Sequence, residues 1–216
     1  MKRNVQKFLA SLLVSSVTAF RLVAAEPAPT PAPADAEVAY TKAIEKRVAD
    51  ILAILDLTDP TKFKNTHDIL IAQYRTLRDW HEVNDAKRKS AKGPEADGFK
   101  ASLKVVHQKF IASLSAELTT EQLEKVKDKM TYGKVQFTYT GYLNEYPTLS
   151  EAQKQKVLEL LQLAREEAMD AGSSDEKSAV FNRYKGKINN YLSTQGVGNP
   201  RKKKPTPVST NSPAAH

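Results

Sequence analysis

"LSEAQKQKVLELLQLAREEAMDAGSSDEK", residues 149–177, contains the start, the body and the end of one helix and then the start of the next. Ser150 is followed three positions later by Gln153, the pairing of a capping box, in which each side chain binds the other residue's backbone NH group. Gly172 then suits the end of the helix. Between them, apolar residues recur at the three-and-four spacing of an amphipathic helix: Val157, Leu158, Leu161, Ala164 and Ala168. The stretch therefore predicts a helix hairpin.

The same starting device occurs twice more in the chain. Ser173 and Glu176 have capping-box spacing, and they predict a last helix whose inward residues are Phe181, Tyr184, Ile188, Tyr191 and Leu192. Thr119 and Gln122 in LTTEQL have the same spacing. Leu118, directly before that cap, can pack against the helix as a hydrophobic staple.

Three more helices are predicted upstream of residue 118. The second of them should start at Pro60, a residue suited to a first helical position, with Thr58 or Asp59 as its cap. The apolar stripes are Ile44, Val48, Ile51, Leu52 and Leu55; then Phe63, His67, Leu70, Tyr74, Leu77 and His81; then Phe99, Leu103, Val106, Phe110 and Leu114. The sequence thus predicts an all-α single domain over residues 36–195, with about six helices in a bundle-like or orthogonal array.

The tyrosine-rich stretch MTYGKVQFTYTGYLNEYP, residues 130–147, interrupts this helical pattern between the fourth and fifth helices. The alternation of Val135, Phe137 and Tyr139 predicts a short extended strand or an ordered loop. A long ordered insertion in a helical domain is often functional. The alternative is that Tyr132 and Phe137 fill a gap between the two helices.

The first 25 residues have the pattern of a secretory signal peptide. Basic residues at the start precede the apolar stretch FLASLLVSSVTAF, and small residues up to Ala25 suit a signal peptidase. We expect cleavage after Ala25, a periplasmic or secreted location, and no membrane span after signal removal; the alternative is a retained N-terminal anchor. Residues 26–35, EPAPTPAPAD, have the composition of an extended linker.

Basic charge is concentrated at the two ends of the chain. Residues 196–216 have too little apolar content to order themselves, and they include the cluster RKKK at 201–204. This basic tail either only aids solubility or touches anionic polymers of the cell envelope. Eight of the 33 Lys and Arg residues lie in the signal and this cluster, and the other 25 balance the 25 Asp and Glu residues. The net charge of +8 therefore does not indicate a nucleic-acid partner.

Few residues carry a recognisable chemistry. The chain has no cysteine, and it lacks a glycine-rich phosphate loop, a GxSxG motif and an HExxH motif. His67 and His81 share one stripe, but fourteen helical residues place them roughly 21 Å apart, which is too far to share a metal. We therefore expect no metal and no cofactor. His107 lies at the edge of its stripe and is expected to have no role.

Polar side chains gather around the predicted helix hairpin. They are Arg165, Asp170, Ser173, Ser174, Arg183, Lys187, Asn189 and Asn190. Arg183, Lys187 and Asn190 share one helix face because they are spaced by four and three residues. This face either contacts a ligand or is simply solvated.

The motifs MTYG, YTGYL, AMDAGSSDEK and YKGKINNYL occur here in that order. Together they resemble the bacterial family catalogued as domain of unknown function 3826, over about Tyr40 to Gly196. The resemblance implies an exported protein linked to sugar binding or polysaccharide use, and it implies no catalytic mechanism. More loosely, LTDPTK, LTTEQL and LSEAQK resemble the LTxxQ elements of small periplasmic helical stress proteins.

Three functions remain open at this point. A carbohydrate-binding or polysaccharide-utilisation accessory protein would present Tyr132, Tyr139 and Tyr142, with Trp80, as platforms for sugar rings. Its ligand would be a glycan or polysaccharide, whose hydroxyl groups would be bound by Asp170, Arg183, Lys187, Asn189 and Asn190. The alternatives are a periplasmic chaperone-like protein and a carbohydrate-active enzyme. The enzyme would use Asp170 with Glu176, or His81 with Asp85, as its acid/base pair.

Overall fold

The computed structural model describes residues 33–198, and all regular structure within them is helical. The helices are α1 (Pro33–Leu52), α2 (Pro60–Arg88), α3 (Pro94–Glu117), α4 (Thr120–Met130), α5 (Lys134–Glu145), α6 (Glu151–Met169) and α7 (Ser174–Thr194). The predicted all-α fold is confirmed. The predicted signal peptide, most of the linker and the basic cluster at 201–204 lie outside the described residues. None of the described helices has the length and apolar character needed to cross a membrane.

The predicted helix starts are confirmed in atomic detail. Thr119 and Gln122 form a complete capping box at the start of α4, and Ser150 and Gln153 form one at the start of α6. Asp59 caps α2, where its Oδ1 accepts a hydrogen bond of 2.8 Å from the backbone NH of Thr61. Local sequence therefore determines where these helices begin, because a side chain supplies the acceptor that the first turn lacks.

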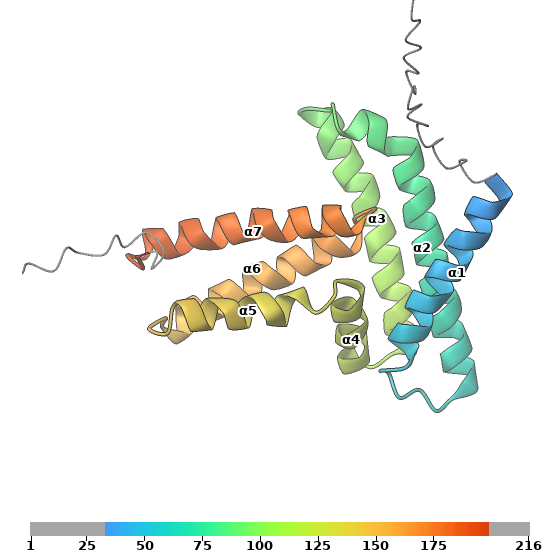
Figure 1. The fold of residues 1–216 in the computed structure, drawn as a ribbon, viewed down its shortest axis with the longest axis horizontal. Helices are drawn as coiled ribbons and strands as arrows, with labels where there is room; N and C mark the ends of the chain where they lie inside the picture. The colour runs from blue at the N-terminus through green and yellow to red at the C-terminus, as the bar shows by residue number, and fades with distance from the viewer. Residues whose placement is uncertain (1–32, 199–216) are drawn as a thin grey trace, which may run out of the picture.

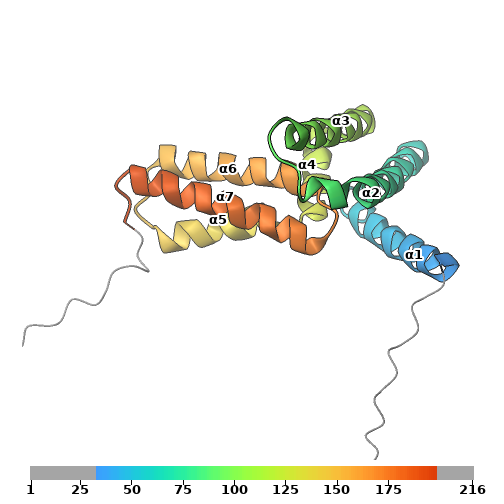
Figure 2. The same ribbon diagram turned by 90° about the horizontal axis from the view of Figure 1, so that it is seen from above.

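Two groups of helices make up the fold. In Figure 1, α1, α2 and α3 run across the long axis of the molecule, α5, α6 and α7 run along it, and α4 lies where the groups meet. Figure 2 shows α5, α6 and α7 packed together as one three-helix group. The predicted helix hairpin of α6 and α7 forms the centre of one group. The packed pair of α2 and α3 forms the centre of the other.

Each group has its own cluster of buried apolar side chains. The first contains Val48, Ile51, Leu52, Leu55, Leu70, Phe110, Leu114, Leu118, Leu123, Val126, Met130 and Met169. The second contains Val135, Tyr142, Tyr146, Leu149, Val157, Leu161, Ala164, Ala168, Val180, Phe181, Tyr184, Ile188 and Leu192. Helix α6 contributes to both, because Ala168 packs in the second cluster while the next residue, Met169, packs in the first.

A buried arginine also connects the two groups. The side chain of Arg165 on α6 is only 6% exposed, and it forms ion pairs with Glu124 and Asp128 on α4. The distance from Arg165 Nη1 to Asp128 Oδ1 is 2.6 Å. These contacts hold α6 against α4, and they therefore set the position of the α5–α7 group relative to the rest of the molecule.

The prediction of an extended tyrosine-rich segment is wrong, because most of it forms helix α5. Val135, Thr138 and Tyr142 are buried at steps of three and four, which is the period of a helix. The alternation that suggested a strand is only one part of this longer pattern. The chain turns between α4 and α5 at Tyr132 and Gly133, whose φ angles are 61° and 63°.

The alternative interpretation of this segment, a plug between helices, is also wrong. The side chain of Tyr132 is 56% exposed and that of Phe137 is 80% exposed. They do not fill an interior gap, because Tyr132 is exposed at the turn before α5 and Phe137 is exposed on α5 itself.

Candidate functional site

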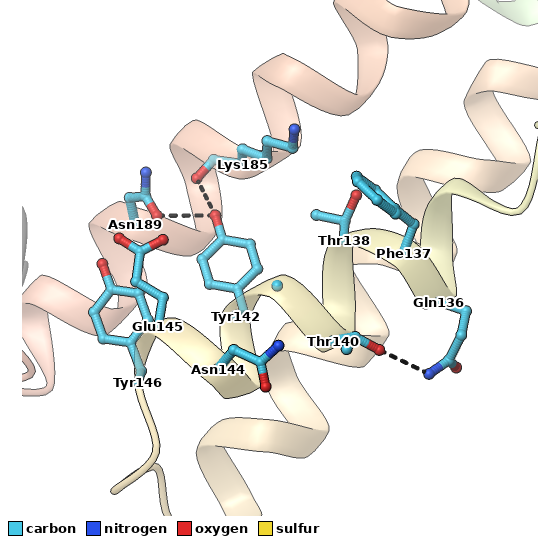
Figure 3. A pocket seen from close by; sticks show the side chains of 11 residues that line it. Gln136, Phe137, Thr138, Thr140, Tyr142, Asn144, Glu145, Tyr146, Lys185 and Asn189 are labelled. Carbon is cyan, nitrogen blue, oxygen red and sulfur yellow. Dashed lines mark hydrogen bonds between the residues drawn. The ribbon is translucent and has the colours of Figure 1, made fainter.

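A hollow lies between α5 and α7, and we call it the α5–α7 groove. Its volume is about 580 Å³. It is lined by Gln136, Phe137, Thr138, Thr140, Gly141, Tyr142, Asn144, Glu145, Tyr146, Lys185 and Asn189 (Figure 3). Apolar rings and amide, hydroxyl and charged groups therefore occur together around one cavity. Most of the lining belongs to the segment from which the sequence predicted function.

The groove follows one stripe of α5 in which the central side chain is missing. Phe137, Gly141 and Glu145 are four residues apart, so they lie above one another on the same helix face. A Cβ atom at Gly141 would have no heavy atom within 4 Å. Packing therefore does not require a glycine there, although a glycine inside a helix costs about 0.5–1 kcal/mol relative to alanine. The missing side chain deepens the groove between its two neighbours.

Tyr142 forms a wall of the groove rather than the exposed platform that the sequence predicted. It is only 7% exposed. Its hydroxyl group lies 2.9 Å from Asn189 Oδ1 and 3.2 Å from the backbone oxygen of Lys185, as Figure 3 shows. The rings of Tyr142 and Tyr146 are stacked with their centroids 6.1 Å apart. These contacts tie α5 to α7 and fix the side chain of Asn189 at the edge of the groove.

The two other predicted tyrosines do not line the groove. Tyr132 is exposed at the turn before α5, and Tyr139 is partly buried against the α5–α7 core. The exposed aromatic ring in the groove is instead that of Phe137. Trp80 lies on α2, where it contacts Phe99 and His81. A helical rather than a strand interpretation of residues 134–145 would have identified Phe137 as the platform.

The predicted polar residues of α7 are divided among several places. Asn189 lines the groove, and Asn190 lines a neighbouring cavity of about 340 Å³. Lys187 does not line either; its Nζ lies 4.0 Å from the centroid of the Tyr184 ring. Arg183 forms an ion pair with Glu167 on α6 and lines a small cleft of about 190 Å³. The sequence left open whether these side chains form a ligand-binding face or a solvated face; in the structure they line separate cavities or none.

Asp170 lies in a different region, where α2, α3, α6 and α7 meet, and we call this region the polar junction. It is 7% exposed, and its carboxylate lies 3.0 Å from His107 Nδ1. Its backbone oxygen accepts a hydrogen bond of 2.7 Å from His81 Nε2. The other ring nitrogen of His81 lies 2.9 Å from Asp85 Oδ1. The contact of His81 with Asp85 that the sequence suggested is confirmed.

His81, Asp170 and Glu176 line the same small cleft of about 190 Å³ as Arg183, but each also has partners within the polar junction. Both ring nitrogens of His81 already have partners, and the carboxylate of Asp170 faces His107. Glu176 Oε2 accepts a hydrogen bond of 3.0 Å from the backbone NH of Gly172, and Glu176 Oε1 lies 2.9 Å from Arg88 Nη2. The capping box predicted for Ser173 is therefore only half formed: the serine Oγ accepts from the Glu176 NH group, but the Glu176 side chain binds elsewhere.

His107 has a structural role that the sequence did not indicate. Its Nε2 lies 3.3 Å from Glu166 Oε2, while its Nδ1 faces Asp170. Hydrogen bonds to Asp170 and Glu166 raise the pKa of His107 to about 9 despite its partial burial. Nearby, Nζ of the buried Lys177 donates a hydrogen bond of 3.1 Å to the Met130 backbone oxygen, and burial lowers the pKa of Lys177 to about 8. These contacts join helices distant in sequence, so periodicity alone could not reveal them.

Within residues 33–198, one group of side chains has the residue types and spacing of a possible metal site. The ligand atoms of His81, Asp85 and Glu176 lie within 4.8 Å of one another. However, Arg88 Nε lies 2.9 Å from Asp85 Oδ1, and the same guanidinium group pairs with Glu176. The arginine already supplies the positive charge that the two carboxylates require. His67 is paired separately with Glu45 and Asp68.

Comparison with protein families gives one match. A family model described as "Protein of unknown function (DUF3826)" matches residues 41–205, which include the α5–α7 groove and the polar junction. A comparison with curated proteins gives no match.

Proposed function

The chain belongs to the DUF3826 family of proteins of unknown function, and from its own geometry we propose that it binds carbohydrate in the α5–α7 groove. The observation that carries this proposal is the joint presence of aromatic and amide side chains around a cavity of about 580 Å³. In cellular terms it would be an exported accessory protein of polysaccharide use. The signal-peptide pattern of residues 1–25 supports export. An exported protein can encounter polysaccharides outside the cell.

The residue types around the groove match the two kinds of surface on a sugar. The CH face of a sugar ring packs on an aromatic ring, and the 80% exposed ring of Phe137 offers such a face. Sugar hydroxyl groups need hydrogen-bonding partners, and amide or hydroxyl side chains can both donate and accept. Asn144 and Thr140 on α5 and Asn189 on α7 supply them (Figure 3).

The two alternative functions receive less support from the geometry. The LTxxQ-like elements at Thr119 and Ser150 are capping boxes, so helix starts alone account for that resemblance. Large exposed apolar residues such as Val38, Val83 and Val105 lie on three different helices, α1, α2 and α3, whereas a client surface would require a contiguous apolar patch. For an enzyme, the candidate groups His81, Asp170 and Glu176 do line a cleft, but it is small, about 190 Å³, and each of the three already has partners within the polar junction.

A pair of glycine substitutions tests the site. Gly141 and Gly186 both lie inside helices, and a Cβ atom at either would have no heavy atom within 4 Å. Only Gly141 lines the groove. We expect Gly141→Trp to fill the groove and abolish glycan binding, whereas the control Gly186→Trp should bind like the unmodified protein. Both variants should fold, because tryptophan is a better helix former than glycine.

Binding is measured by affinity electrophoresis in gels that contain xylan, β-glucan, mannan or starch, and by a glycan array. Phe137→Ala should weaken binding roughly 2- to 12-fold, the value of an aromatic contact of about 0.5–1.5 kcal/mol. Absence of binding to every gel and every array glycan would refute the proposed function. Equal loss of binding in Gly141→Trp and Gly186→Trp would show that the groove is not the site.

A further inference from the structure

The α5–α7 groove does not end at Tyr146, because a second cavity adjoins it there. This cavity has a volume of about 340 Å³ and is lined by Tyr146, Asn189, Asn190, Leu192, Ser193, Gly196, Val197 and Gly198. Tyr146 and Asn189 line both cavities. The two hollows are therefore neighbouring parts of one depression, with these two side chains at their boundary.

One side of helix α7 runs along both cavities. Lys185, Asn189 and Ser193 are four residues apart, so they form one stripe that begins in the groove and ends in the second cavity. The stripe is about 12 Å long at 1.5 Å per residue, and Phe137 and Val197 extend the lined region beyond it at either end. This length exceeds that of a single sugar ring.

The end of the second cavity is closed by the turn that follows α7. Gly196 has a φ angle of 73°, and the backbone NH of Val197 donates a hydrogen bond of 2.9 Å to Leu192 O. A Cβ atom at Gly198 would have no heavy atom within 4 Å. The backbone is thus directly approachable here, and its peptide groups offer additional hydrogen-bonding partners to a ligand.

The two cavities together show no preference for charge. Of their lining residues, only Glu145 and Lys185 are charged, and they have opposite signs. The second cavity is lined by amide, hydroxyl, apolar and glycine residues. A polymer of uronic acids would meet no excess of positive charge along this path.

We infer that the ligand is a neutral, extended oligosaccharide segment that occupies both cavities, with one sugar unit against Phe137 and Gly141 and a later unit against Asn190 and Ser193. Tyr146 and Asn189 contact the chain where it passes between the cavities. This inference rests on the proposed function, because it assigns the kind of glycan to the same site.

The test measures affinity against chain length. The probes are xylo-, cello-, manno- and malto-oligosaccharides of one to six units, titrated calorimetrically into the full chain. For the series that binds, we expect affinity to rise by roughly tenfold or more between the single sugar and the tetrasaccharide and then to level off, since the second unit binds at high effective concentration. An oligogalacturonate of equal length should bind more weakly.

Variants separate the two cavities. Ser193→Trp should fill the second cavity, reduce tetrasaccharide affinity to that of a short ligand, and leave the short ligand unaffected. Gly186→Trp, on the same helix but outside both cavities, serves as the control. Affinity that does not change with chain length, or a tetrasaccharide that binds Ser193→Trp as tightly as the unmodified protein, would overturn the inference alone. No binding at any length would overturn the proposed function as well.

Discussion

The substitution Gly172→Ala should destabilise the protein through one contact. A Cβ atom at position 172 would lie 2.9 Å from His81 Cγ and 3.1 Å from His81 Cδ2. The ring cannot retreat, because it is buried and held on both sides by the backbone oxygen of Asp170, at 2.7 Å, and by Asp85, at 2.9 Å. The backbone at Gly172 does not have a left-handed φ angle, so the cost comes from the ring contact.

The expected magnitude is a balance of two effects. Overpacking a well-packed interior costs about 1–3 kcal/mol. Replacing glycine by alanine recovers about 0.4–1 kcal/mol by restricting the unfolded chain. The free energy of unfolding should therefore fall by about 1–2 kcal/mol, which corresponds to a decrease in Tm of about 2–8 °C for a chain of this size.

Urea unfolding followed by circular dichroism measures this change, and the m value should stay constant. The decisive comparison is a double-mutant cycle with His81→Ala. Without the ring, Gly172→Ala should no longer destabilise and should become neutral or slightly stabilising. An equal cost in both backgrounds, or no cost in either, would refute the reasoning.

Three further predictions concern stability. Gly141→Ala and Gly186→Ala should each stabilise the protein by about 0.5–1 kcal/mol and should be additive, because both positions have open space around the new methyl group; thermal unfolding measures this, and a decrease in Tm would contradict it. Arg165→Met should cost about 1–3 kcal/mol, because Asp128 loses the arginine and Glu124 is left with Lys127. Arg183→Ala, which breaks an exposed pair, should cost less than about 1 kcal/mol in the same urea assay; equal costs would contradict the difference in burial. Because its two carboxylate neighbours raise the pKa of His107 from 6.5 to about 9, its contribution to stability should be fully present below pH 6.5 and lost as the pH rises through about 9; the stability difference from His107→Gln, measured between pH 6 and 10, should shrink accordingly, and a difference that grows with pH would contradict it.

The helices that the sequence predicts most accurately are those with local start signals. The capping boxes at Thr119 and Ser150 and the cap at Asp59 need only residues within one helical turn, so the chain specifies them without reference to the fold. The start of α1 was less exact: the helix begins at Pro33, just before the expected boundary at residue 36. Nothing in that segment signals a cap, and proline is tolerated in a first turn.

Helix α5 shows why the remaining prediction failed. Its start at Lys134 has no side-chain cap, because the residue before it is Gly133. This glycine is in the left-handed conformation and lies in the short turn after α4, which ends at Met130. Apolar residues alternate over the five residues 135–139, and helical spacing extends over the twelve residues 134–145. The strand prediction rests on the shorter of these two patterns. The predicted platforms were therefore Tyr132, Tyr139 and Tyr142, of which only the buried Tyr142 lines the groove, and the exposed ring of Phe137 was not among them.

The polar junction could not be predicted, because its contacts span large separations in sequence. His81 meets Asp170, and Arg88 meets Glu176, only when the turn between α6 and α7 packs against α2. The sequence nevertheless identified several of the participating side chains by type. It could not determine which pairs would form or that they would be used in contacts between helices.

Helix α6 links the folding of the two halves of the molecule. Its adjacent residues Ala168 and Met169 belong to different apolar clusters, and its Arg165 binds α4. Fraying of α6 would remove side chains from both clusters at once, so we expect the two helix groups to unfold together. Amide hydrogens in the α6 interior should therefore exchange only through global unfolding, and the groove should keep its shape up to the melting temperature.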